Sequence, residues 1–148
     1  MLRKVLLVAA LAAAMSTSVN AQSVEQTLRN FGLFGTWATD CSRPAANNNF
    51  QTVYKSSGGR VLRTYYDGPG KIYSEYRITE ATQISSDQLR YWQEGTDSKR
   101  LRVEIIVKKV DNRILIWLSR NVDGGLFVKD GKYVDDGSGV AWQTLCHK

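Results

Sequence analysis

Histidine is nearly absent from this sequence, and the residue patterns of the common enzyme classes are missing as well. The single histidine is His147, next to the last residue, and a side chain at a chain end is usually solvated and poorly positioned. No Gly-x-Ser-x-Gly, His-Glu-x-x-His or P-loop pattern occurs, and no metal-binding cluster is apparent. We therefore expect a protein that is not an enzyme and that holds no metal or other cofactor.

Paired carboxylates could still supply acid–base chemistry. Those on expected strands could pair in space, but solvated charges on an outer face are the simpler interpretation of each. These residues are Asp40, Glu75, Glu94 and Glu104.

An apolar run long enough to span a membrane as a permanent helix is also lacking. The apolar stretch from Val5 to Met15 follows two basic residues and precedes the small residues of Val19-Asn20-Ala21. This order is typical of a secretory signal. We predict a signal peptide over residues 1–21, export to the periplasm or out of the cell, and one domain over residues 22–148 without a transmembrane segment.

Cysteine is scarce, with Cys41 and Cys146 lying near the two ends of the expected mature chain. An even number of cysteines in an exported protein favours a disulfide. Two free thiols or a redox role are the alternatives, and the missing Cys-x-x-Cys pattern disfavours the redox role. A bridge would place the first and last strands side by side, or nearly so.

Charge of one sign is in only small excess. The formal net charge of +6 falls to +4 without Arg3 and Lys4, and the basic residues are scattered among acidic ones. The nearest approach to a single-strand nucleic-acid surface is the mixture of basic and aromatic residues at Arg60, Arg63, Tyr65 and Tyr66. An exported protein seldom meets nucleic acid, so we expect no such partner.

One short helix is predicted directly after the signal peptide. Ser23 and Gln26 have the spacing of a capping box, and Gly32 suits a left-handed helix end. Apolar residues at helical spacing lie between them, namely Val24, Leu28 and Phe31.

The remainder alternates short β-forming runs with turns rich in Gly, Asp and Asn, a spacing that favours an all-β sandwich or barrel. We predict an antiparallel up-and-down meander that closes into a barrel of about eight strands. The expected strands cover residues 35–41, 50–57, 60–66, 71–81, 88–94, the two halves of 101–120, a small hairpin within 126–134, and 140–146.

The most apolar part of this meander is a hairpin over Leu101–Arg120, with Asp111-Asn112 as a two-residue turn. The turn fixes which residues share a face. The predicted pairs are Val107 with Ile116, Ile105 with Leu118, and Val103 with Arg120. Arg120 then becomes the one charged residue on an apolar face, at the end away from the turn. There it would suit a carboxylate or phosphate group, or the strand ends and Arg120 reaches solvent or pairs with an Asp.

Gly35-x-Trp37 on the first strand, after a short helix and before a meander, resembles the calycin superfamily and above all the lipocalins. The resemblance implies that Gly35 opens the first barrel strand and that Trp37 fills the closed end. The stretch Gly35–Ser42, together with the late cysteine, is also similar to small exported bacterial proteins of unassigned function. That second resemblance implies export and a disulfide, and it does not indicate which activity the protein has.

These observations favour an exported, non-enzymatic barrel that binds a small, partly apolar or anionic ligand. The alternative of an interior filled by side chains stays open. The candidate ligand-binding residues are Arg120, Tyr76, Ile105, Ile116, Leu118 and Val103. A second hypothesis is a protein-binding module, such as an inhibitor of an envelope hydrolase or an assembly partner, that uses the loops 42–49 and 126–136.

Overall fold

The computed structural model describes residues 23–148, so the predicted signal peptide over residues 1–21 lies outside the described part. Within this range, one helix, α1 (Val24–Phe31), precedes ten strands. The strands are β1 (Gly35–Ala38), β2 (Gln51–Ser57), β3 (Arg60–Gly68), β4 (Lys71–Gln83), β5 (Gln88–Gly95), β6 (Arg102–Val110), β7 (Arg113–Asn121), β8 (Leu126–Lys129), β9 (Lys132–Tyr133) and β10 (Gln143–His147).

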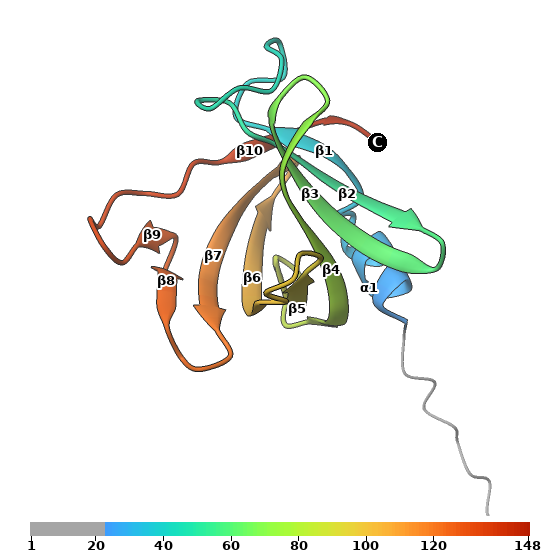
Figure 1. The fold of residues 1–148 in the computed structure, drawn as a ribbon, viewed down its shortest axis with the longest axis vertical. Helices are drawn as coiled ribbons and strands as arrows, with labels where there is room; N and C mark the ends of the chain where they lie inside the picture. The colour runs from blue at the N-terminus through green and yellow to red at the C-terminus, as the bar shows by residue number, and fades with distance from the viewer. Residues whose placement is uncertain (1–22) are drawn as a thin grey trace, which may run out of the picture.

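Eight of these strands form a closed antiparallel barrel, which confirms the predicted fold class. Strands β1 to β7 follow one another in the sheet, and β10 pairs with both β1 and β7. The small hairpin predicted within 126–134 is the pair β8 and β9, which extends from β7 outside the closed wall. In Figure 1 this hairpin and the chain that follows it lie to one side of the barrel.

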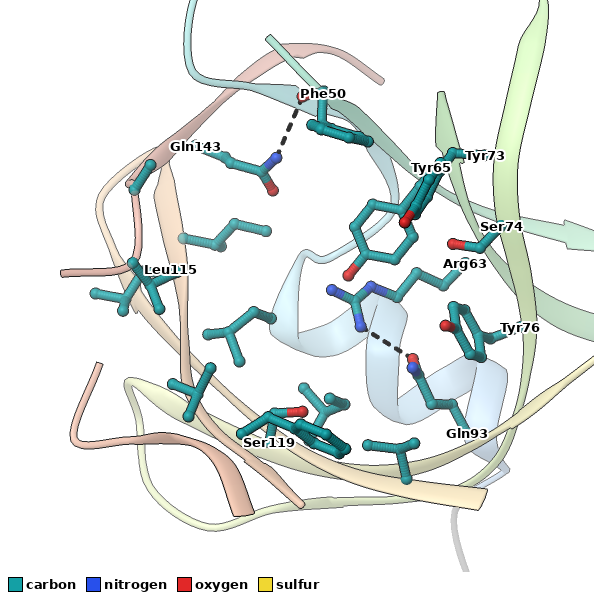
Figure 2. Close-up of a pocket in the computed structure, with 18 of the residues that line it drawn as sticks. Phe50, Arg63, Tyr65, Tyr73, Ser74, Tyr76, Gln93, Leu115, Ser119 and Gln143 are labelled. Carbon is teal, nitrogen blue, oxygen red and sulfur yellow. Dashed lines mark hydrogen bonds between the residues drawn. The ribbon is translucent and has the colours of Figure 1, made fainter. Parts of the chain in front are cut away.

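The helix forms where the capping residues predicted it. Ser23 Oγ accepts a hydrogen bond from the backbone N–H of Gln26 at 3.1 Å, and Gly32 ends the helix with a φ of 74°. The buried face of α1 contributes Leu28 and Phe31 to the hydrophobic core. Figure 2 shows α1 behind the barrel interior, so the helix covers one end of the barrel.

The core fills this helix-covered end with large side chains. Trp37 is fully buried, and its Nε1 donates to the carbonyl of Leu33 at 2.8 Å. The residues that pack in the same cluster include Tyr54, Val61, Ile78, Leu89, Tyr91 and Val107. Strands β2 to β6 therefore meet α1 through a solid layer of side chains.

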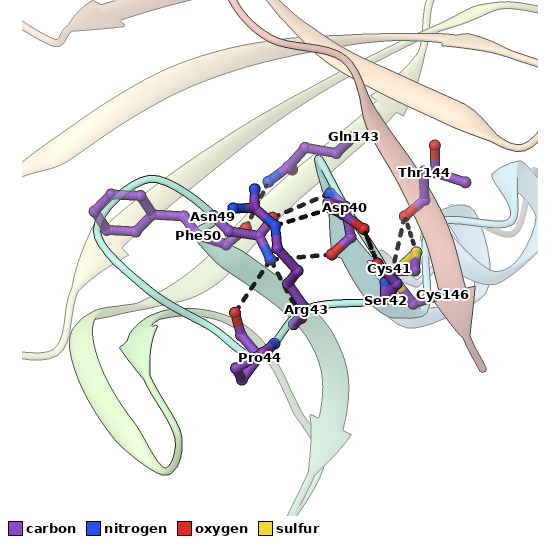
Figure 3. The surroundings of a disulfide bond; sticks show 10 residues. All are labelled: Asp40, Cys41, Ser42, Arg43, Pro44, Asn49, Phe50, Gln143, Thr144 and Cys146. Carbon is purple, nitrogen blue, oxygen red and sulfur yellow. Dashed lines mark hydrogen bonds and ion pairs between the residues drawn. A yellow bond between two sulfur atoms is a disulfide. The ribbon is translucent and has the colours of Figure 1, made fainter.

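The predicted disulfide is present and joins the two ends of the meander. Cys41 follows β1 and Cys146 lies on β10, with their Cα atoms 5.3 Å apart. Strands β1 and β10 are hydrogen-bonded neighbours, so the bridge ties the two strands that close the barrel (Figure 3).

The predicted register of the central hairpin holds near its turn and is wrong beyond it. Val107 does face Ile116, but Trp117 has no partner on β6, and Ile106 faces Leu118. Such a β-bulge exchanges the faces of all residues that follow. The corrected pairs are Ile105 with Ser119, Glu104 with Arg120, and Val103 with Asn121.

Candidate functional site

The barrel contains a cavity of about 610 Å³ beyond the core layer. Apolar atoms form most of its wall, and the loop residues Asn47 and Asn48 border it. The aliphatic and aromatic contributors include Phe50, Leu101, Ile105, Ile116, Phe127 and Val140. A cavity of this volume and lining is of the size that proteins use for small ligands, and the interior is therefore not filled throughout.

Four of the six predicted ligand-binding residues line this cavity: Tyr76, Val103, Ile105 and Ile116. Their part in binding stays a prediction. Leu118 and Arg120 do not line it, because the bulge at Trp117 turns both away from the interior. In their place, Ser119 projects into the cavity (Figure 2).

Arg120 pairs with an acidic residue on the outer face of the barrel. Its Nε lies 2.5 Å from Oε2 of Glu104, whose side chain is only 5% exposed. A buried carboxylate is costly without a partner, so Arg120 serves to stabilise Glu104. The predicted position of Arg120 on the apolar inner face is wrong. The alternative of an ion pair is correct, although the partner is Glu104 and not an Asp.

A different cation, Arg63 of β3, occupies the interior. Arg63 is 2% exposed, lines the cavity and points into it between Tyr65, Tyr76 and Gln93 (Figure 2). Its Nη1 donates to Oε1 of Gln93 at 3.0 Å, and its guanidinium lies 4.4 Å from the ring centroid of Tyr65. The Nε atom is buried and has no hydrogen-bond partner among the described residues.

No acidic side chain neutralises Arg63 within residues 23–148, because none of the ion pairs there includes it. Its surroundings are a side-chain amide and aromatic rings, the second ring being that of Tyr54 at 5.7 Å. An amide oxygen and an aromatic ring each stabilise a cation less than a carboxylate does. The site thus holds a positive charge that its own side chains stabilise only in part.

Arg63 lies directly next to the core layer, at the inner end of the cavity. Val61, two residues earlier on the same face of β3, belongs to the core, while Tyr65, two residues later, lines the cavity. Beneath Arg63, the hydroxyl groups of Tyr54 and Tyr91 share a hydrogen bond of 2.9 Å. Burial raises the pKa of Tyr91 well above its usual value, although the charge of Arg63 opposes this. Tyr91 therefore stays neutral.

Arg63 was not among the predicted ligand-binding residues, although the alternation along β3 could have indicated it. Val61, Arg63 and Tyr65 are spaced by two and share one face of the strand. The exposed Arg60 lies on the other face. The basic and aromatic residues that resembled a nucleic-acid surface are therefore divided between the inside and the outside of the barrel.

The loop at residues 42–49 is held in place by a buried asparagine. The side chain of Asn49 donates to the carbonyls of Asp40, Arg43 and Pro44, and its Oδ1 accepts from the backbone N–H of Asp40 (Figure 3). Hydrogen bonds from Ser42 lower the pKa of Asp40. These bonds position Asn47 and Asn48 at the cavity.

The other candidate carboxylates also have partners outside the cavity. Glu75 accepts a hydrogen bond from Thr64, and Glu94 lies 3.9 Å from Arg102.

Residues 23–148 contain no group of three or more His, Cys, Asp or Glu placed to hold a metal ion. Within the same range, no helix has the length and apolarity needed to cross a membrane.

The two loops that the protein-binding hypothesis named both reach the cavity. Asn47 and Asn48 come from the first loop, and Phe127, Val128 and Tyr133 come from the second.

Comparisons with protein-family models, with curated proteins and with solved structures found no match to this chain.

Proposed function

We propose that this protein is an exported, non-enzymatic barrel that binds a small, partly apolar molecule in its interior, in the manner of a lipocalin. The observation that carries the proposal is the cavity of about 610 Å³, whose wall is mostly apolar and which begins where the core layer ends. A wall of this kind gains free energy when it removes apolar ligand surface from water.

Export is part of the proposal and has two supports. The first is the pattern of a secretory signal over residues 1–21. The second is the Cys41–Cys146 disulfide, a bond that persists in oxidising compartments. We favour ligand binding over a protein-binding role, because both loops that would serve a protein partner contribute side chains to the cavity.

The test is binding of a neutral apolar probe, N-phenyl-1-naphthylamine, whose fluorescence rises when it leaves water. We expect saturable binding to the wild-type protein and at least a tenfold loss of affinity in Ser119→Phe, which fills the cavity at a position that points into it. The matched control is Ser57→Phe at the exposed end of β2, where the affinity stays unchanged. No saturable binding to the wild type, or equal binding by both variants, contradicts the proposal.

A further inference from the structure

We infer that the ligand carries a single carboxylate and an apolar tail, and that Arg63 binds the carboxylate. This inference rests on the ligand binding proposed for the cavity and names the chemical class of the ligand. The observation behind it is a buried guanidinium that points into the cavity and has no acidic partner within residues 23–148.

The guanidinium has hydrogen-bonding capacity to spare. An arginine side chain carries five N–H donors and stays protonated at any physiological pH. Gln93 accepts from Nη1, whereas the buried Nε has no hydrogen-bond partner in the part of the chain that the structure describes. A carboxylate can accept two parallel hydrogen bonds from one guanidinium. It would thus supply both the missing acceptors and the missing negative charge.

The charge of the cavity favours a monoanion. Of the residues between 23 and 148 that line it, Arg63 is the only one with a charged side chain. A carboxylate carries one negative charge and matches this single cation. A phosphate monoester carries between one and two at neutral pH, and the excess charge would be buried among apolar groups.

The position of Arg63 also sets the direction in which the ligand lies. Arg63 is next to the core layer, whereas Tyr73, Leu101 and Phe127 line the cavity and are each about half exposed or more. These three residues therefore mark the solvent side. A carboxylate at Arg63 directs the apolar tail along Ile105 and Ile116 toward that side.

The experiment compares ligands that share one tail and differ in the head group. Decanoic acid, decanol and decyl phosphate each compete with bound N-phenyl-1-naphthylamine at pH 7.5. We expect decanoate to displace the probe at a concentration about tenfold to a hundredfold lower than decanol does, which is the range for hydrogen bonds to a charged group. Arg63→Met, of similar length and without charge, should bring this ratio close to one while the probe still binds.

Two further variants test whether the preference depends on the donor geometry of Arg63 and on its position in the cavity. Arg63→Lys keeps the charge but loses the planar pair of donors, so part of the preference for decanoate should remain. Arg90→Met removes an arginine from the exposed face of β5 and should leave the ratio at its wild-type value.

The possible outcomes distinguish a failure of this inference from a failure of the proposed function. Equal displacement by decanoate and decanol in the wild type overturns the inference and leaves the proposed function intact. Stronger displacement by decyl phosphate also overturns it, because the head group would then be a phosphate. A preference that persists in Arg63→Met shows that another residue binds the carboxylate. If the probe does not bind to the wild type at all, the proposed function itself is wrong.

Discussion

Arg63 shows how a residue can be unfavourable for folding and still be held firmly in place. Removing a charge from water costs free energy unless a partner compensates it. Here the compensation comes from Gln93, itself 3% exposed, and from the rings of Tyr65 and Tyr54. Functional sites are where such local conflicts with stability are expected.

The contributions of Gln93 and Arg63 to the free energy of unfolding should therefore be strongly coupled. Gln93→Leu alone leaves the buried guanidinium without its side-chain acceptor, so we expect a loss of about 1–3 kcal/mol in the free energy of unfolding. In an Arg63→Met background the same change should cost little or raise stability, because two apolar groups then replace both partners. Urea unfolding of the four proteins in this cycle measures the coupling. A cost of Gln93→Leu that is the same in both backgrounds contradicts the interpretation.

At the scale of the elements, the caps, turns and most strands followed from local sequence. The Ser23 side chain, the left-handed Gly32 and the Asp111-Asn112 turn act on neighbouring residues, so the helix ends and the hairpin turn lie where they were predicted. The bulge in β7 did not follow. The carbonyl of Trp117 accepts from the backbone N–H of Gly131 at 3.0 Å, a contact with the β8–β9 turn that short-range patterns do not encode. That bulge moved Arg120 and Leu118 out of the predicted site.

The close approach of β1 to β10 depends on the glycine of the Gly-x-Trp pattern. Gly35 has a φ of 131°, and a Cβ atom there would lie 2.6 Å from the backbone oxygen of His147. Gly35→Ala should therefore lower the free energy of unfolding by about 2–5 kcal/mol through backbone strain and steric conflict. Gly58→Ala is the control, since its φ is 57° and its Cβ meets no atom within 4 Å. We expect it to cost about 1 kcal/mol. Equal losses in thermal or urea unfolding would exclude a special role for Gly35.

At the scale of the whole molecule, the closed barrel was predictable and its cavity was not. The two cysteines predicted that the first and last strands lie side by side, or nearly so, and the strands do pair. Whether an eight-stranded barrel is solid or hollow depends on which side chains meet across it. Trp37, Tyr54 and Tyr91 fill the end that α1 covers, whereas the side chains from Arg63 outward leave a cavity between them. Strand alternation predicted four of the residues that line the cavity. It did not predict how far the core layer extends into the barrel.

The Cys41–Cys146 bridge should stabilise the barrel as a whole, because it closes a loop that contains most of the chain. Its sequence separation is 105, and loss of chain entropy in the unfolded state is worth roughly 4.7 kcal/mol for a loop of about 100 residues, as an upper figure. Reduction should therefore lower the melting temperature by about 5–15 °C. Scanning calorimetry with and without a phosphine reductant measures the change, and the double variant Cys41→Ala/Cys146→Ala should melt at the lower temperature under both conditions. If the wild type melts at the same temperature with and without reductant, β1–β10 pairing alone suffices to close the barrel.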